Sequence, residues 1–316
     1  MISIAMATYN GEKYLREQID SILNQTIQDF ELIICDDCST DTTWNILLDY
    51  QVQDKRIKCY RNEENLGFKK NFEKAIGLCT GEYIALSDQD DIWLPEHLEM
   101  LAKIIGDADI ACGNSELIDK TGKNSNKLLS EASDLYVLYS HEKMTYRLLC
   151  YSNPFQGASM LIRRNFLFEK ALPIPEGVLY HDAWFAACAC LSNGIHYTFD
   201  VVTLYRQHEK NASGQKKQWS VMHAIIRAFS SIFKKTEYTT DRFAYIEEMK
   251  NRFSLSEKQK KILEECSMYL RLHKGELPFR EKVQCLSWYW KHYKYIFTSK
   301  TNKYRLSRTI KLFLTK

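Results

Sequence analysis

Three carboxylates stand within four positions of the sequence, at Asp88, Asp90 and Asp91. They directly follow residues 83–87, an apolar run that predicts a β-strand. Like charges this close repel one another unless a cation or solvent screens them. Carboxylate oxygens suit Mg²⁺ or Mn²⁺, and such an ion can bridge to the phosphates of a substrate. A solvated acidic turn that caps the next helix is the equally weighted alternative for this motif alone.

A polar segment after the apolar run at residues 2–7 contains Thr8, Tyr9, Asn10 and Glu12. Small polar residues beside an aromatic side chain can line a nucleobase pocket. An Asn-Gly turn followed by a helix start explains the same residues. For this segment taken alone, the turn is the favoured interpretation.

Two further polar segments follow predicted strands. Asp36 and Asp37 end an apolar run, and a carboxylate at a strand's carboxyl end can accept hydrogen bonds from a ribose hydroxyl or a base N–H. Asn65-Leu66-Gly67 precedes a predicted helix, whose first backbone N–H groups could meet a phosphate together with Lys69 or Lys70. A turn with a helix cap is the alternative for the two aspartates.

Two later residues fit the chemistry of the same kind of site. Asp182 begins a predicted helix at residues 182–191 and could serve as a general base. An N-cap role is the alternative, and the helix dipole is expected to hold this carboxylate ionised. His208 follows a predicted strand and could ligate a metal, although a surface role is favoured for a single histidine.

Apolar β-prone runs alternate with amphipathic stretches over the first 112 residues. We expect strands at 2–7, 30–35, 57–60, 83–87 and 109–112, with helices at 12–25, 42–51, 69–78 and 95–105. Repeated β-α-β units imply an α/β fold with a mainly parallel sheet between helices, and ligands bind beyond the carboxyl ends of such strands. The polar segments that follow these strands should therefore lie close together at one edge of the sheet. Further strands are expected at 157–162 and 196–205, and residues 217–314 should be almost entirely helical.

The net charge of +3 conceals an uneven distribution along the chain. Residues 1–215 carry a net charge of −11, and residues 216–316 carry one of +14. A bound metal ion would let the acidic front part accept a diphosphate, while the basic rear part suits an anionic surface. Ten cysteines without framework spacing, and a start without secretory character, favour a cytoplasmic protein with free thiols. No run of 18 apolar residues is long enough to span a membrane.

The polar segments together resemble family 2 glycosyltransferases, the inverting enzymes of the GT-A fold. Residues 7–10, 36–41, 65–67 and 88–91 match the family's pieces in order and spacing, and the resemblance covers roughly residues 1–210. It implies a GT-A catalytic domain at residues 1–215 and a basic, mostly helical C-terminal region at residues 216–316. It also implies a nucleotide-sugar donor and a divalent metal, Mn²⁺ or Mg²⁺.

The resemblance implies a role for each matching residue. Asp90 would hold the metal on the diphosphate, and His208 would complete the metal's shell. Asp182 would deprotonate the acceptor hydroxyl, which then displaces the diphosphate with inversion. The expected nucleotide-sugar contacts are Thr8, Tyr9, Asn10, Glu12, Asp36, Asp37, Asn65, Gly67, Lys70 and Asp88.

Residues 87–93, 181–184 and 205–208 resemble a rhamnosyltransferase-like branch that builds bacterial surface polysaccharides. The implied donor is dTDP-rhamnose or a UDP-sugar, and the implied acceptor is a glycan or a lipid-linked saccharide. Processive family members carry Gln-x-x-Arg-Trp followed by membrane spans. Residues 215–219 read Gln-Lys-Lys-Gln-Trp and lack that arginine, which favours a distributive enzyme.

The basic rear part interleaves aromatic and lysine residues. Leu286, Trp290, Tyr293 and Phe297 form a rough helical stripe, and residues 305–316 repeat the pattern. Basic amphipathic helices can lie on anionic lipid, which favours a peripheral position at the inner face of the cell membrane. Burial of the stripes against the catalytic domain or another subunit is the alternative. The oligomeric state stays open.

Two other function classes compete with the transferase. A nucleic-acid-binding protein could use the basic rear part, but it leaves the converging polar segments unexplained and no nucleic-acid motif is present. A sugar nucleotidyltransferase also uses a nucleotide-binding α/β sheet. That class resembles a different pattern, with a Gly-rich basic loop after the first strand, which residues 7–12 do not supply. We therefore expect no nucleic-acid partner.

Overall fold

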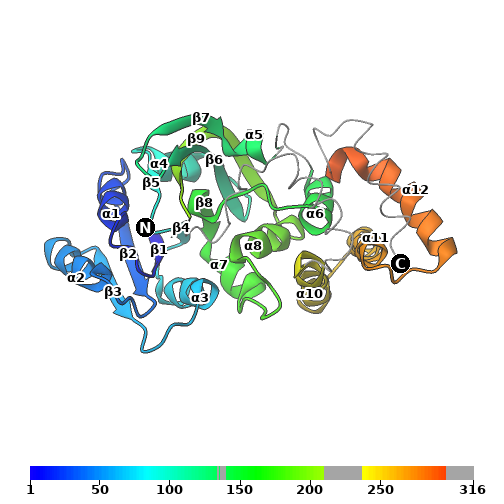
Figure 1. Cartoon of the computed structure of the whole chain (residues 1–316), viewed down its shortest axis with the longest axis horizontal. Coiled ribbons are helices and arrows are strands. Elements are labelled where there is room, and N and C mark those ends of the chain that lie inside the picture. The colour runs from blue at the N-terminus through cyan, green and yellow to red at the C-terminus, as the bar shows by residue number, and fades with distance from the viewer. Residues whose placement is uncertain (134, 136–139, 210–236, 297–316) are drawn as a thin grey trace.

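The computed structural model describes residues 1–133, 135, 140–209 and 237–296 (Figure 1). Strands and helices alternate through the first part as the sequence predicts, except that the short strand at Ile92–Trp93 was not expected. The strands there are β1 (Ile2–Thr8), β2 (Phe30–Asp36), β3 (Ile57–Arg61), β4 (Tyr83–Ser87) and β5 (Ile92–Trp93). The helices between and after them are α1 (Leu15–Leu23), α2 (Thr43–Gln53), α3 (Phe68–Leu78) and α4 (His97–Ile104).

The sheet runs in the order β3-β2-β1-β4-β8-β6-β9-β5, with β7 paired to β6. β3, β2, β1 and β4 are all parallel, so their carboxyl ends meet at one edge. β8 (Met160–Arg163) is antiparallel to both of its neighbours, β4 and β6 (Ile110–Asp119). β9 (Ile195–Gln207) is parallel to β6, which places the segment after Gln207 beside the end of β4.

Helices cover both faces of the parallel part because its side chains alternate in direction with a period of two. Ile4 and Met6 of β1 pack in a core cluster with α1, α2 and α4. Ala5, between them, packs in a second cluster with α3, α6 (His141–Cys150) and α8 (His181–Cys190). Burial of one such isoleucine contributes about 2 kcal/mol, so the two clusters hold the strand ends in fixed positions.

The second half differs from the sequence expectation in its boundaries. β6 extends well beyond residue 112, since it pairs along its length with β9, and that pairing is invisible in either strand alone. The expected strand at 157–162 begins as a 3₁₀ turn (Gly157–Ser159) before β8. The remaining elements are β7 (Asn124–Leu128), α5 (Leu129–Ala132), α7 (Arg164–Phe166) and a π-helical turn (Leu167–Ala171).

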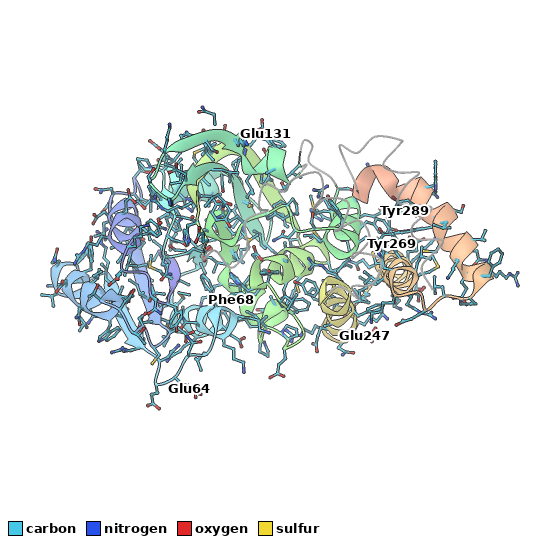
Figure 2. The ribbon with its side chains drawn as sticks, viewed as in Figure 1. Glu64, Phe68, Glu131, Glu247, Tyr269 and Tyr289 are labelled. Atoms are coloured by element: carbon cyan, nitrogen blue, oxygen red, sulfur yellow. The ribbon has the colours of Figure 1, made fainter. Side chains whose placement is uncertain are left out.

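Three helices follow: α10 (Glu237–Arg252), α11 (Glu257–Lys274) and α12 (Phe279–Ile296), at the right of Figure 1. They pack against α6 and α8 and share one core cluster with them. Tyr269 and Tyr289 stack between α11 and α12 with ring centroids 5.9 Å apart (Figure 2). None of the helices in the described residues is long and apolar enough to cross a membrane.

The packing of α12 bears on the predicted membrane stripe. Leu286 is buried in the shared core, so the burial alternative holds for that residue. Trp290 keeps 39% of its surface exposed. The side chain of Tyr293, together with Phe297 and residues 305–316, lies outside the described residues. The predicted domain boundary at 215 lies outside them as well, within residues 210–236. Membrane contact therefore stays a prediction.

Candidate active site

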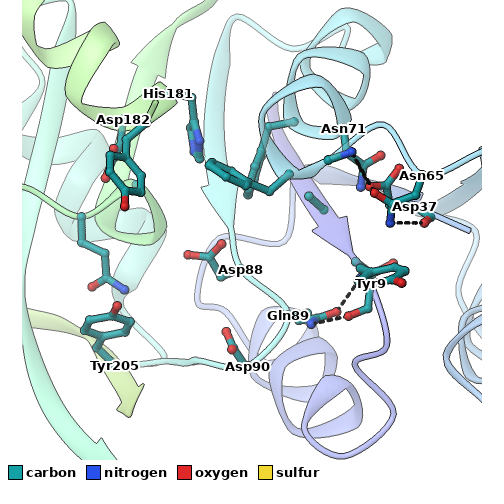
Figure 3. Close-up of a pocket in the computed structure, with 18 residues that line it drawn as sticks. Tyr9, Asp37, Asn65, Asn71, Asp88, Gln89, Asp90, His181, Asp182 and Tyr205 are labelled. Atoms are coloured by element: carbon teal, nitrogen blue, oxygen red, sulfur yellow. Dashed lines mark hydrogen bonds between the residues drawn. The ribbon is translucent and has the colours of Figure 1, made fainter. Parts of the chain in front are cut away.

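A cavity of about 380 Å³ opens at the carboxyl ends of β1 and β4 (Figure 3). α3 and the start of α8 contribute to its walls. The segments that the sequence analysis singled out do converge, as expected for the carboxyl edge of a parallel sheet. Eight of the predicted site residues line the cavity: Thr8, Tyr9, Asp37, Asn65, Gly67, Asp88, Asp90 and Asp182.

Asp90 and His208 form a close pair beside the cavity. His208 Nε2 lies 2.6 Å from Asp90 Oδ2, although the two residues are 118 positions apart, and both side chains are largely buried. The imidazole stacks on Tyr14 with ring centroids 5.1 Å apart, which fixes its plane. The pairing of β9 with β5 and β6 therefore brings together the two residues predicted to hold the metal.

Asp88 faces the middle of the cavity, between Asp182 and Gln89 in Figure 3. Burial, and then the negative charges of Asp90 and Asp182, raise the pKa of Asp88 to about 7. Within the described ranges, no group of three or more His, Cys, Asp or Glu side chains is arranged as a metal site. The Asp90 carboxylate nonetheless suits Mn²⁺ or Mg²⁺, because such ions keep several waters and take further oxygens from a substrate's phosphates. The His208 imidazole fits Mn²⁺ better than Mg²⁺, which prefers oxygen ligands.

The third carboxylate of the acidic motif, Asp91, does not join Asp88 and Asp90 at the cavity. Asp91 is fully buried and is not among the residues that line the cavity. Its Oδ1 accepts from the backbone N of Arg206 (3.0 Å), and its Oδ2 accepts from Gln156 Nε2 (3.0 Å). Burial, followed by the charges of Asp90 and Asp88, raises its pKa well above the usual range. Asp91 therefore anchors β9 and Gln156 beneath the site.

Asp182 is the second residue of α8, so the N-cap role considered for it is wrong; Tyr180 is the N-cap. Its Oδ1 accepts from the backbone N of Ala183 at 2.6 Å. Burial raises the pKa of Asp182 to about 6, and backbone hydrogen bonds from the helix start oppose that rise. Burial outweighs the expected effect of the helix dipole, yet the carboxylate is still mainly ionised at neutral pH.

Gly157 keeps the approach to Asp182 open. A Cβ at position 157 would lie 3.3 Å from His181 Nε2 and 3.4 Å from the Cβ of Asp182. His181 packs on Phe72 with ring centroids 4.3 Å apart, and burial lowers its pKa to about 4. The imidazole is thus neutral at physiological pH and adds no positive charge beside the carboxylate.

Asp37 organises the opposite end of the cavity. Its Oδ1 accepts from the backbone N of Leu66 (2.8 Å) and its Oδ2 from that of Gly67 (2.9 Å). Asn65 Nδ2 donates to the backbone carbonyl of Asp37 (3.1 Å). The loops after β2 and β3 are therefore joined around one carboxylate. Tyr9, 47% exposed, lies across the cavity from Asp182 (Figure 3).

Asn10 and Glu12 are not among the cavity-lining residues; both connect their loop to the start of α2. Asn10 Oδ1 accepts from the backbone N of Thr40 (2.8 Å). Glu12 Oε2 accepts from the backbone N of Thr42, the N-cap of α2 (3.0 Å). In this structure both side chains shape the loop that carries Tyr9.

Asp36 and Lys70 also lie outside the cavity lining. Asp36 is fully buried, and it accepts from the backbone N of Ser39 (3.0 Å) and from Thr8 Oγ1 (3.1 Å). Of the two adjacent aspartates, Asp37 is thus the one that faces the cavity. Lys70 is exposed on α3.

Several cavity residues were not predicted from the sequence. Gln89 stands inside the acidic motif, and Tyr180 directly precedes the His181-Asp182 pair, so their neighbours could have indicated them. Phe68, Gln156 and Tyr205 also line the cavity. No spacing rule marks Gln156, because only the register of β8 and the buried contact with Asp91 bring it there.

Comparison with known proteins identifies a family that the chain matches. The family model described as glycosyl transferase family 2 matches residues 3–172, more than half of the chain. An uncharacterized glycosyltransferase of Methanocaldococcus jannaschii is 33% identical over 207 residues, covering 64% of this chain and 68% of that protein. The Escherichia coli UDP-Glc:alpha-D-GlcNAc-diphosphoundecaprenol beta-1,3-glucosyltransferase WfgD is 28% identical over 230 residues, covering 70% of this chain and 85% of that protein.

Two solved structures share the fold of this chain. Residues 1–349 of Staphylococcus aureus TarS, in complex with UDP-GlcNAc, superpose with a TM-score of 0.54 at 18% identity, covering 99% of this chain and 89% of that one. The mannosyltransferase PcManGT of Pyrobaculum calidifontis, in complex with GDP-Man and Mn²⁺, gives a TM-score of 0.56 at 17% identity, covering 99% and 84%. At these identities the likeness concerns the fold alone.

Proposed function

The chain belongs to glycosyl transferase family 2, and from that premise we propose an inverting, metal-dependent transfer of a sugar from a nucleoside-diphosphate sugar to a saccharide or lipid-linked saccharide. The fold is of the GT-A type, with a helical C-terminal region. One observation carries the proposal: the Asp90–His208 pair, the Asp182 carboxylate and the loops around Asp37 all meet at one cavity. Family membership favours this reaction over the nucleotidyltransferase and nucleic-acid-binding alternatives.

The donor nucleotide is proposed to lie at the end of the cavity formed by Thr8, Tyr9, Asp37 and Asn65. Tyr9 offers an exposed ring for a base, and Asp37 Oδ2, which already accepts from the backbone N of Gly67, can accept a second hydrogen bond from a base N–H. The relative WfgD uses UDP-Glc by its name, and the two solved neighbours hold UDP-GlcNAc and GDP-Man. A UDP-sugar or dTDP-rhamnose is therefore the proposed donor.

Asp90 and His208 are proposed to hold the divalent ion, with Asp88 near the ribose and the diphosphate. When bound, Mn²⁺ or Mg²⁺ neutralises the negative charge that grows on the departing diphosphate. The two proposed ligands follow separate strands, β4 and β9, and packing holds them, because His208 stacks on Tyr14 and Arg206 Nε donates to the backbone carbonyl of Asp90 (2.8 Å). These contacts keep both side chains at the site before a substrate arrives, and a bound ion would replace the direct contact between Asp90 Oδ2 and His208 Nε2.

Asp182 is proposed to be the general base. It lies across Asp88 from the proposed nucleotide end (Figure 3). An acceptor hydroxyl at Asp182 would therefore approach the donor's anomeric carbon from that side. With a pKa of about 6 the carboxylate is ionised at neutral pH and can take the hydroxyl proton as the new bond forms. Attack from the face opposite the departing diphosphate inverts the anomeric configuration.

The acceptor is proposed to be a glycan or a lipid-linked saccharide in bacterial surface polysaccharide synthesis. WfgD acts on a diphosphoundecaprenol-linked sugar by its name. A peripheral position at the inner face of the membrane, with residues 1–215 as the catalytic domain and the basic residues 216–316 toward the lipid, fits such an acceptor.

A panel of sugar nucleotides tests the proposal. UDP-glucose, UDP-GlcNAc, GDP-mannose and dTDP-rhamnose are each added with Mn²⁺ or with EDTA, and thermal stability and slow donor hydrolysis are measured. A donor at about a hundred times its Kd stabilises the folded state by about 3 kcal/mol. We expect one nucleotide class to stabilise the protein in Mn²⁺ and to lose that effect in EDTA. Absence of any cation-dependent stabilisation across the panel would contradict the proposed donor and metal.

A further inference from the structure

Two exposed aromatic rings stand at the Asp182 side of the cavity. Phe68, the first residue of α3, is 42% exposed, and Tyr180, the N-cap of α8, is 40% exposed. Both line the cavity, and their ring centroids are 6.2 Å apart. Figure 2 shows Phe68 low in the centre of the molecule, where α3 adjoins the segment before α8. Large aromatic side chains that stay exposed inside a concave polar site require an explanation.

The rings rest on a rigid base. Behind them His181 packs on Phe72, and Phe68 also lies 6.2 Å from His181, centroid to centroid. Tyr245 Oη, from α10, donates to the backbone carbonyl of Tyr180 (3.2 Å). The helical C-terminal region thus helps to hold Tyr180 in place.

Lys69 holds the segment that carries Phe68 at a set distance from the segment that carries Tyr180. Its Nζ donates to the backbone carbonyls of Pro175 (3.1 Å), Glu176 (2.8 Å) and Val178 (2.9 Å). An ammonium group has three hydrogens, so these three bonds use all of its donors. The bonds join the start of α3 to the segment that leads into Tyr180. Phe68 and Tyr180 are therefore preorganised, and Lys69 is committed to this contact instead of to a phosphate.

The position of the Phe68 and Tyr180 rings indicates which ligand they would bind. The nucleotide end lies on the far side of Asp88, so a donor bound there presents its sugar toward Asp182 (Figure 3). An acceptor must place one hydroxyl at Asp182 and the rest of its ring beside it. Sugar rings carry faces of C–H groups with slight positive charge, which suit the negative face of an aromatic ring, and their hydroxyls suit the nearby polar groups.

We propose that Phe68 and Tyr180 form the acceptor subsite, on which a saccharide ring stacks with one hydroxyl directed at Asp182, and that Lys69 is a positioning residue for it. The inference rests on the proposed function, since it takes Asp182 to be the base. Gly157 lines the cavity without a side chain and so leaves space beside Asp182.

Saturation-transfer difference NMR with simple sugars tests the subsite. The probes are the methyl glycosides of glucose, galactose, N-acetylglucosamine and rhamnose, at millimolar concentration, on the full chain with Mg²⁺ and UDP, GDP or dTDP. We expect at least one glycoside to receive saturation through its C–H face. We expect Phe68→Ala and Tyr180→Ala each to lower its affinity by about tenfold, and Tyr180→Phe to retain it.

The controls separate the subsite from general damage. Phe199 is equally exposed, at 42%, lies on β9 and does not line the cavity, so Phe199→Ala should leave glycoside affinity unchanged. Lys69→Met should weaken glycoside binding while the nucleoside diphosphate keeps its Kd, a split that simple loss of stability would not produce.

The outcomes distinguish failure of the acceptor subsite from failure of the proposed function. A nucleoside diphosphate that binds with Mg²⁺, together with no glycoside signal or with a signal that both alanine variants retain, would overturn the acceptor subsite alone. Failure of all three nucleoside diphosphates to bind with Mg²⁺ would contradict the proposed function and remove the subsite with it.

Discussion

The side-chain amide of Gln89 pairs with both backbone polar groups of Tyr9. Gln89 Oε1 accepts from the backbone N of Tyr9 (2.8 Å), and Gln89 Nε2 donates to its carbonyl (3.0 Å). The space for this pair exists because residue 11 is glycine; a Cβ there would lie 2.2 Å from Gln89 Oε1. The middle residue of the Asp88–Asp90 motif thus joins the acidic loop to the loop proposed to contact the base.

This pair predicts that cation binding and nucleotide binding are coupled through Gln89. Gln89→Ala should weaken binding of a nucleoside diphosphate by about tenfold in Mn²⁺ and reduce the enhancement that Mn²⁺ gives. Calorimetric titrations with and without Mn²⁺ measure both effects.

Gly11→Ala is a second route to the same change, because its methyl group displaces the amide without altering Gln89. Gln89→Ala and Gly11→Ala break the same two hydrogen bonds between Gln89 and Tyr9. The double variant should therefore lose no more nucleotide affinity than either single variant. Additive losses would show that Gly11 and Gln89 act independently.

Asp90→Asn should remove the cation dependence of nucleotide binding. The amide keeps the size of the side chain but loses the negative charge and one acceptor oxygen beside His208, so cation affinity should fall by about 10–100-fold. Thermal shift with a nucleoside diphosphate over a Mn²⁺ titration measures it. An unchanged Mn²⁺ midpoint would contradict Asp90 as a metal ligand.

Asp91→Ala should affect stability, in contrast to Asp90→Asn. Removal of the carboxylate leaves the backbone N of Arg206 and the side-chain amide of Gln156 without their buried acceptor. We expect a loss of about 2–3 kcal/mol in the free energy of unfolding, seen as a lower Tm. The Mn²⁺ midpoint of nucleotide binding should stay near the parent value in the folded variant. Loss of the Mn²⁺ response would place Asp91 in the metal site.

Transfer should depend on the ionisation of Asp182. The pKa of Asp182 is raised to about 6, so the base is ionised above that pH and protonated below it. The rate of transfer should therefore be level above about pH 7 and fall by roughly tenfold per pH unit well below pH 6. Single-turnover rates across this range give the profile.

Asp182→Asn should keep cation-dependent nucleotide binding and lose transfer at every pH. The amide has nearly the same shape, so the donor site is undisturbed, but it cannot accept the hydroxyl proton as a base. Transfer by this variant at the parent rate would show that another group is the base.

Much of the fold and part of the site follow from local patterns. Apolar β-prone runs and 3.6-residue periodicity predicted the strands and helices through residue 105 with boundaries shifted by a few residues at most, except for the short strand β5, which was missed. Since parallel strands end at one edge, the polar segments after them had to lie near one another. That reasoning anticipated the shared cavity of Thr8, Tyr9, Asp37, Asn65 and Asp88.

Local patterns could not tell which of two adjacent side chains points into the site and which points away from it. Asp90 and Asp91 are adjacent and chemically alike, yet one pairs with His208 and the other is buried against Arg206 and Gln156. Lys69 and Lys70 divide in the same way, one bonded to three carbonyls and the other exposed. Successive side chains point to different sides of a turn or helix, and the sequence does not record which side is the cavity.

The sequence by itself therefore determined most strands and helices of the first 105 residues, the parallel edge and the kinds of side chain gathered there. The tertiary structure alone decided which member of each pair faces the cavity and that Leu286 is buried in the shared core. It also brought Phe68 beside Tyr180. The physical reason is that these outcomes depend on contacts between residues distant in the chain, whereas propensity and periodicity describe only a residue's near neighbours.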